Sequence, residues 1–147
     1  MVTTLILTHG GLAKELMSAA EIIVGELQGF KVVALEWDDS IEEATRKTRR
    51  ILDAVDPEDE VLILTDMYGG TPYNVALSLA EPGRIEVVTG VNLPMVVRLG
   101  CPGSNDMGVS DLAKWIQVKA RKSICRAAEA NPNHQPENEA DEKRRHD

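Results

Sequence analysis

The residue with the clearest chemical use in this sequence is His9, which ends an apolar run near the N-terminus and is followed at once by two glycines. The run, residues 3–8, is short and contains β-branched residues, so it predicts a buried strand. A helical pattern begins at Leu12, which places His9 where the carboxyl end of a strand meets the N-terminus of a helix. Ligands bind at that edge in open α/β sheets, and the unpaired N–H groups of a helix N-terminus suit an anion. We therefore expect His9, which has no other histidine before position 134, to accept a phosphoryl group.

Asp66 stands at the end of another apolar run, residues 60–66, immediately before a glycine-rich loop. If the strands that end at His9 and Asp66 are neighbours, the two residues lie about 4.8 Å apart, which is the spacing of paired strands. An aspartate there hydrogen-bonds one imidazole nitrogen, fixes the tautomer and makes the other nitrogen the better nucleophile. The same carboxylate stabilises the cationic ring that forms as phosphorus is attacked.

The oxygens of a phosphoryl group need hydrogen-bond donors along the same edge of the sheet. The candidates are the amides of Gly10, Gly11 and the loop 67–71, together with the hydroxyl of Thr71. Thr71 is also a predicted helix N-cap, because a proline follows it at the first helical position.

Simpler interpretations of these residues stay open at this point. A lone histidine after a strand is more often a turn or capping residue than a nucleophile, and an aspartate there often only caps the following loop. A zinc site is disfavoured, because the folded region has no second histidine and Cys101 and Cys125 are far from His9 in the sequence. The chain has no Gly-x-Ser-x-Gly elbow, no dinucleotide fingerprint and no P-loop. We therefore expect neither a serine hydrolase nor a bound nucleotide, and we expect no metal or cofactor.

Strand and helix patterns alternate along the chain. Strands are predicted at residues 3–8, 31–37, 60–66 and 84–89, and helices at 12–24, 41–56, 72–80, 94–99 and from 111 onward. The loops between them are short, which predicts a parallel sheet with helices on both faces, and the continuous apolar runs fit strands buried on both sides. Ser40 and Glu43 have the spacing of a capping box at the start of the second helix.

Composition limits the class of protein. The length of 147 residues suits one domain, and 43% apolar residues with only 3% aromatic ones predict an aliphatic core. A net charge of −8 argues against binding to nucleic acid or to an acidic membrane. The sequence has no apolar run of the roughly 18 residues that a membrane span needs and no signal peptide, so we expect a soluble, cytoplasmic protein.

The C-terminal region divides into two parts. Residues 119–126 are basic and either continue the last helix or form a short edge strand. The following segment, residues 127–147, is polar and acidic and predicts a disordered tail.

Three motifs taken together resemble the mannose-family IIA domain of the bacterial phosphoenolpyruvate-dependent sugar phosphotransferase system, which includes mannose, fructose and sorbose members. They are Thr-His-Gly at residues 8–10, Asp-Met-Tyr-Gly-Gly-Thr-Pro-Tyr-Asn at 66–74 and Gly-Val-Asn-Leu-Pro-Met at 90–95. The resemblance covers roughly residues 2–126, with order and spacing intact.

This resemblance implies a function and a set of site residues. Family members carry a phosphoryl group on the histidine that matches His9, take it from the phosphocarrier protein HPr and pass it to a IIB component. The aspartate that matches Asp66 orients the histidine. The phosphate site is framed by residues matching Tyr68, Gly69, Gly70, Thr71 and Asn92.

The resemblance also implies an architecture. The expected fold is a doubly wound sheet of four parallel strands in the order 2-1-3-4, flanked by helices. A fifth, antiparallel strand at about residues 120–126 is exchanged between two subunits, so a homodimer is expected. The carrier domain is then 1–126, its IIB partner is a separate protein, and the chain associates with a membrane permease complex without inserting into the membrane.

Three other functions share some of these features. A regulatory protein of an incomplete phosphotransferase system could use the same chemistry at His9 to report phosphorylation. The phosphoryl-donor subunit of a dihydroxyacetone kinase is similar near the histidine, although the Gly-Gly-Thr-Pro-Tyr-Asn loop looks more like the mannose branch. In a non-catalytic flavodoxin-like binding module, His9 would be only a turn residue.

Overall fold

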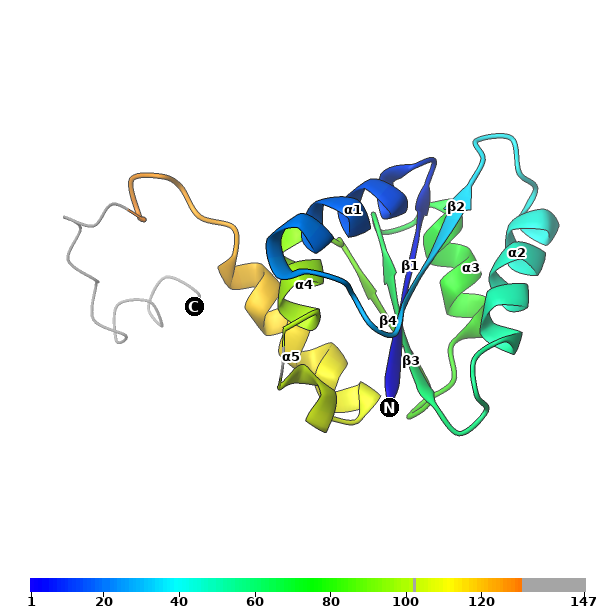
Figure 1. The fold of residues 1–147 in the computed structure, drawn as a ribbon. Helices are drawn as coiled ribbons and strands as arrows, with labels where there is room; N and C mark the ends of the chain where they lie inside the picture. The colour runs from blue at the N-terminus through cyan, green and yellow to red at the C-terminus, as the bar shows by residue number, and fades with distance from the viewer. Residues whose placement is uncertain (102, 131–147) are drawn as a thin grey trace, which may run out of the picture.

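The computed structural model describes residues 1–101 and 103–130. Its centre is a parallel sheet of four strands in the order β2-β1-β3-β4 (Figure 1), which confirms the predicted fold class and strand order. The strands are β1 Val2–His9, β2 Phe30–Leu35, β3 Glu60–Thr65 and β4 Ile85–Thr89.

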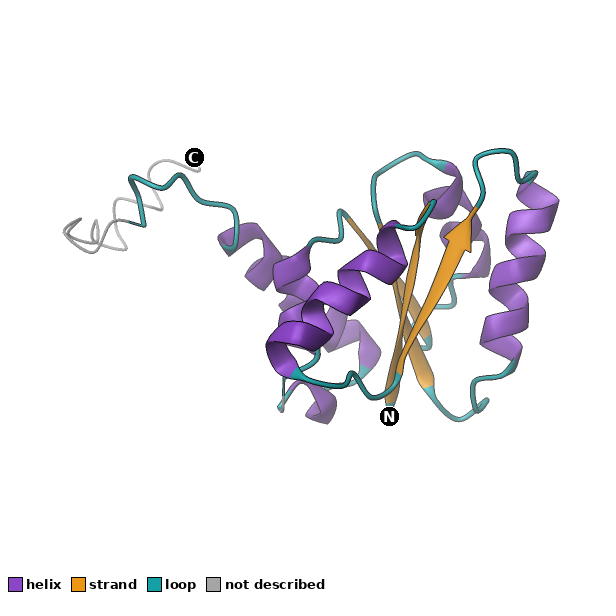
Figure 2. Cartoon of the chain, turned by 45° about the horizontal axis from the view of Figure 1, so that its top comes forward, coloured by secondary structure: helices purple, strands orange, loops and turns teal. Residues whose placement is uncertain are grey.

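Helices cover both faces of this sheet. They are α1 Leu12–Val24, α2 Ile41–Asp53, α3 Thr71–Leu79, α4 Leu93–Leu99 and α5 Val109–Lys122, with a short 3-10 turn, η1, at Ser104–Asp106. Helices α2 and α3 pack on one face, and α1, α4 and α5 pack on the other (Figure 2). None of the described helices is long and apolar enough to cross a membrane.

Burial on both faces explains the continuous apolar runs in the two central strands, β1 and β3. Leu5 and Leu7 of β1 point into the core beneath α2 and α3, whereas Ile6, between them, points into the core beneath α1, α4 and α5. Alternate residues of β3 divide in the same way. A strand that is buried on both faces has few positions for a polar side chain, and the polar residues that these two strands bury are all threonines, so the hydrophobic pattern is continuous instead of alternating.

Of two predicted helix N-caps, the structure contains one and places the other at a different residue. The capping box at the start of α2 is present, since Glu43 N–H donates to Ser40 Oγ and Ser40 N–H donates to the Glu43 carboxylate. The prediction that Thr71 caps α3 is wrong, because the N-cap is Gly70 and Thr71 is already helical.

The C-terminal segment differs from the expected strand. Helix α5 continues to Lys122, and residues 123–130 form turns and coil with no strand pairing. A strand exchanged between subunits needs the partner's sheet to satisfy its backbone groups, and a single chain offers none, so local helix formation prevails over residues 120–122. After α5 the chain leaves the body of the domain (orange in Figure 1). The predicted tail, 127–147, lies outside the described residues from position 131 onward.

Candidate functional site

The site forms where two loops leave the carboxyl edge of the sheet in opposite directions. From β1 the chain turns into α1 on one face, and from the neighbouring strand β3 it turns into α3 on the other face. This divergence between adjacent strands is the topological switch point at which open α/β sheets bind ligands. Thr65, the last residue of β3, pairs with Leu7, so Asp66 comes level with the end of β1 and its carboxylate reaches His9.

The Asp66 carboxylate holds His9 through two hydrogen bonds. Its Oδ2 atom lies 2.8 Å from His9 Nδ1 and accepts the backbone N–H of His9 at 3.0 Å. Its other oxygen, Oδ1, accepts the N–H of Met67 at 3.0 Å. With three partners and a side chain only 11% exposed, this carboxylate is anchored on both sides. It therefore fixes the position of the imidazole and not merely its charge.

The tautomer of His9 follows from this geometry. An ionised carboxylate oxygen only accepts hydrogen bonds, so the proton of a neutral imidazole must lie on Nδ1. The lone pair is then on Nε2, which makes no hydrogen bond to any of the described residues. Since the His9 side chain is 21% exposed, the ring is partly open to solvent, and a free lone pair on Nε2 is what a nucleophile requires.

Gly70 lies directly against the reactive edge of the imidazole. A Cβ atom at this position would stand 2.8 Å from His9 Cε1 and 3.3 Å from Nε2. The Gly70 backbone is extended, with φ −84° and ψ 175°, so conformational freedom does not explain the glycine. The position accepts only a hydrogen atom because the His9 ring occupies the space of a side chain.

Two helix N-termini point toward this edge. Helix α1 begins one residue after Gly11, and α3 begins one residue after Gly70. No acidic residue stands in the first turn of α3, so the positive end of its dipole is not neutralised locally. The free N–H groups of such a terminus are suited to the oxygens of a phosphoryl group.

The predicted phosphate-binding residues fall into two groups. Gly11, Gly69 and Gly70 lie in the two loops that adjoin His9, and Thr71 is the first residue of α3. The Gly10 N–H instead donates to Leu35 O at 2.8 Å, so this amide joins β1 to β2 and does not face a phosphoryl group.

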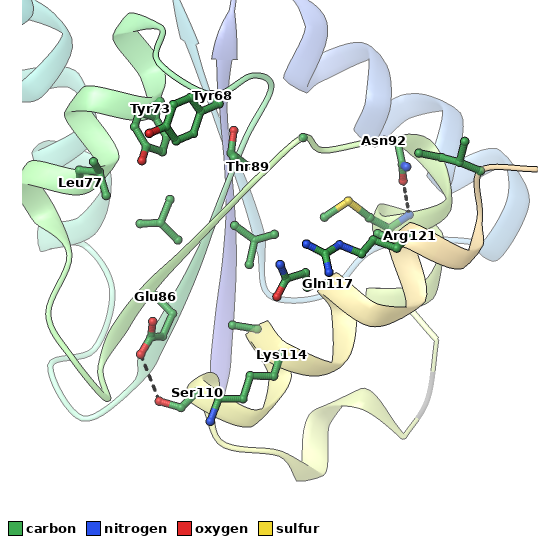
Figure 3. Close-up of a pocket in the computed structure, with 17 residues that line it drawn as sticks. Tyr68, Tyr73, Leu77, Glu86, Thr89, Asn92, Ser110, Lys114, Gln117 and Arg121 are labelled. Carbon is green, nitrogen blue, oxygen red and sulfur yellow. Dashed lines mark hydrogen bonds between the residues drawn. The ribbon is translucent and has the colours of Figure 1, made fainter. Parts of the chain in front are cut away.

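Tyr68 and Asn92 face a groove beside β4 (Figure 3). The Tyr68 ring lies 4.7 Å from that of Tyr73, centroid to centroid. Burial is the main cause that raises the pKa of Tyr73, and the adjacent Tyr68 raises it further. The phenol of Tyr73 therefore stays neutral at ordinary pH. Asn92 caps α4 by accepting the Met95 N–H at 3.0 Å, and its amide donates to Ser123 Oγ. The observed contacts of Asn92 are thus with α4 and the end of α5.

Sequence reasoning missed two residues that shape the site. The Thr8 hydroxyl, fully buried, accepts the Ala13 N–H at 2.8 Å and so braces the turn that carries His9. The indole of Trp37 stacks on the His9 ring, with centroids 5.0 Å apart and planes 18° apart. The only signal for Trp37 was a large aromatic at the last residue of the second predicted strand, 31–37, and the strand order is what places it beside His9.

Metal chemistry finds no support in the described region, which holds no group of three or more histidine, cysteine or acidic side chains arranged to bind an ion. What the edge does hold is one oriented nucleophile, an anchored carboxylate and two helix N-termini. A doubly wound domain with this edge is suited to covalent transfer of an anionic group through histidine.

Comparison with known proteins identifies the family. The sequence model described as "PTS system fructose IIA component" matches residues 3–113. The chain is 34% identical over 125 residues to the PTS system fructose-specific EIIA component of Bacillus subtilis (strain 168), covering 84% of this chain and 85% of that protein. The chain therefore belongs to the family of IIA components of the mannose, fructose and sorbose phosphotransferase systems, as its motifs predicted.

Two further similarities agree with this assignment. The PTS system mannose-specific EIIAB component of Escherichia coli (strain K12) is 29% identical over 126 residues, which cover 85% of this chain and 39% of that longer protein. The solved structure of a mannose/sorbose specific IIA subunit of the phosphotransferase system from Enterococcus faecalis superposes with a TM-score of 0.77 at 26% identity, covering 92% of this chain and 96% of that one.

Proposed function

We propose that this chain is a cytoplasmic phosphoryl carrier, in which His9 Nε2 accepts a phosphoryl group from HPr and passes it to a IIB component during sugar uptake. The observation that carries the proposal is the 2.8 Å contact between His9 Nδ1 and Asp66 Oδ2, which leaves Nε2 as an accessible lone pair. The same contact argues against a binding module in which His9 only completes a turn.

The transfer is a displacement at phosphorus between two histidines. The lone pair of His9 Nε2 attacks the phosphorus of the donor's phosphohistidine, and a new N–P bond forms as the donor's N–P bond breaks and its electron pair returns to the donor ring. Positive charge then develops on the His9 ring, and Asp66 stabilises it through Nδ1–H. Amides of the 67–71 loop and of the two helix N-termini stabilise the equatorial oxygens. The second transfer, to IIB, is the same step in reverse.

The surroundings of His9 suit a protein donor. The nearby side chains of Trp37, Met67 and Tyr68 are 81%, 57% and 76% exposed, respectively. Exposed apolar and aromatic groups are common at the centres of protein interfaces. An open site of this kind lets a second protein bring its own phosphohistidine into line with Nε2.

A labelling experiment tests the carrier function. The protein is incubated with labelled phosphoenolpyruvate, the general phosphotransferase enzyme and HPr, and acid-labile phosphate is then measured on wild type and on His9→Ala. We expect label on wild type only, which is lost when a IIB protein is added. An unlabelled wild type or a fully labelled His9→Ala would eliminate the carrier. Label that no IIB protein removes would favour the regulatory role.

The proposal includes a homodimer. Apart from a single bridge between Ile85 and Glu81, β4 pairs only with β3 among the described residues, so most of its outer edge is open. Beside that edge runs a groove of about 690 Å³ between α3 and α5 (Figure 3). Ile124, which is 79% exposed, is one of the residues that line it. An open strand edge is a template for pairing with another chain. The segment that follows α5 in a second copy is the proposed occupant.

Sedimentation at micromolar concentration tests the dimer. We expect a species of twice the chain mass of 16.1 kDa, and Ile124→Asp should reduce it to the monomer. Ile22→Asp is the matched control, because Ile22 is 88% exposed on α1 and lies outside the groove. A monomeric wild type would refute the dimer, and equal behaviour of both variants would refute the proposed occupant.

A further inference from the structure

We propose that Trp37 is a positioning residue for His9, which holds the plane of the imidazole and stabilises its cationic form during phosphoryl transfer. This inference rests on the carrier function proposed above. The indole stacks on the ring with centroids 5.0 Å apart and an interplanar angle of 18°. Trp37 is 81% exposed, so burial of the indole does not explain its place.

The backbone brings Trp37 to His9 through the pairing of β1 with β2. His9 pairs with Leu35, and the Gly10 N–H donates to Leu35 O at 2.8 Å, so Trp37 emerges beside the end of β1. The indole lies directly against this turn, since a Cβ at Gly10 would stand 3.6 Å from Trp37 Nε1, an ordinary van der Waals contact. What favours glycine at this position is its φ of +54°, a left-handed value.

The turn that carries Trp37 is held from both ends. The Glu36 N–H donates to Asp39 Oδ2 at 3.0 Å, and the Asp39 N–H donates to Glu36 O at 3.1 Å. Lys47 on α2 binds the same Asp39 oxygen at 2.6 Å. These bonds connect the residues on either side of Trp37 to a helix, so the indole is directed toward the imidazole by a braced turn.

The ring needs this support because its other contacts leave one motion open. Asp66 fixes Nδ1 but still permits the imidazole to tilt about that hydrogen bond. The indole face blocks tilting out of the plane, whereas the Cε1–Nε2 edge lies against Gly70, which has no side chain to cover it. When Nε2 bonds to phosphorus the ring becomes a cation, and an indole face attracts a cation held against it.

The main alternative is that Trp37 only binds the donor protein. A small donor separates the two roles, because phosphoramidate has no surface to dock. In that reaction the Nε2 lone pair attacks phosphorus, the P–N bond to nitrogen breaks, and ammonia leaves with the electron pair and a proton. A positioning residue affects this reaction, whereas a docking residue does not.

The experiment compares Trp37→Leu and Trp37→Phe with wild type in the full-length protein, using phosphoramidate and HPr as donors. We expect Trp37→Leu to slow labelling by phosphoramidate about 2- to 5-fold, which is the size of an exposed cation–π contact, and Trp37→Phe to restore most of the rate. In a Trp115→Phe background, where Trp37 is the sole tryptophan, phosphorylation should also change the indole emission. His9→Ala should abolish that change.

Several results would overturn the inference. Wild-type labelling of Trp37→Leu by phosphoramidate, combined with a higher KM for HPr, would make Trp37 a docking residue. If Trp37→Phe fails to recover activity, or if the indole emission does not change on phosphorylation, the aromatic face has no part in the mechanism. A wild type that neither donor labels would instead overturn the carrier function, and the inference with it.

Discussion

Alanine in place of Gly70 adds one methyl group, yet it should disable His9. The new Cβ would stand 2.8 Å from His9 Cε1, about 0.6 Å inside the 3.4 Å at which ordinary van der Waals contact begins. The backbone at Gly70, with φ −84° and ψ 175°, accepts alanine without strain. The imidazole is therefore the group that must move.

The cost of that movement can be estimated from the hydrogen bond it breaks. A shift of about 0.6 Å takes Nδ1···Oδ2 from 2.8 Å toward the limit of a hydrogen bond. Hydrogen bonds to charged groups contribute about 1.5–3 kcal/mol, so the transfer rate should fall roughly 10- to 150-fold. Folding stability should change little, because replacing glycine at a compatible site stabilises by about 0.4–1 kcal/mol and offsets part of the clash.

The assay measures single-turnover labelling from phosphorylated HPr, with thermal unfolding of the same samples. Gly108→Ala is the matched control, since Gly108 is likewise the N-cap of a helix, has φ −67°, and a Cβ there would meet only the Glu60 carboxylate at 3.8 Å, an ordinary contact. A Gly70→Ala protein that transfers as fast as Gly108→Ala would refute the reasoning. A large fall in Tm for Gly70→Ala would show that the backbone, and not the imidazole, absorbs the clash.

Three further changes test separate parts of the structure. Asp66→Asn should slow transfer about 10- to 100-fold with little change in Tm, measured by rapid quench, because the charge that stabilises the cationic ring is lost; an unchanged rate would exclude Asp66 from the mechanism. Ser40→Ala should lower the free energy of unfolding by about 0.5–2 kcal/mol in urea while leaving transfer intact, since it removes the cap of α2; no change would mean that the cap is redundant. The hydrogen bond from Lys47 lowers the pKa of Asp39 below its ordinary 3.8, so this carboxylate stabilises the fold fully above that value and loses the effect as pH falls through its lowered pKa. Asp39→Asn should therefore flatten the loss of stability between about pH 5 and pH 2, and an identical acid limb in both proteins would contradict the assignment.

Much of the fold could be predicted because its signals are local or strongly patterned. The apolar runs of β1 and β3 required burial on both faces, and the spacing of Ser40 and Glu43 specified a capping box that the structure contains. The first helix begins at Leu12 and ends at Val24, as its glycine flanks indicated. Such features depend on hydrogen bonds within a few residues, so no knowledge of distant partners was needed.

The errors occur where a distant partner decides the conformation. Thr71 has good N-cap chemistry, but it is already helical, and the N-cap is Gly70, where the His9 ring leaves no space for a side chain. Residues 120–126 were expected to form a strand, yet α5 continues to Lys122, because backbone groups pair locally when no second sheet is within reach.

By itself the sequence determined the class of fold and, through three motifs, the family, and it predicted His9 as the nucleophile. Only the tertiary structure decided which nitrogen of His9 bonds to Asp66 and what surrounds the ring. Pairing of β1 with β3 brings Asp66 to Nδ1 across 57 positions of sequence, and pairing of β1 with β2 brings Trp37 to the face of the same ring. The physical reason is that strand order arises from long-range packing and hydrogen bonding, which no local pattern in either strand records.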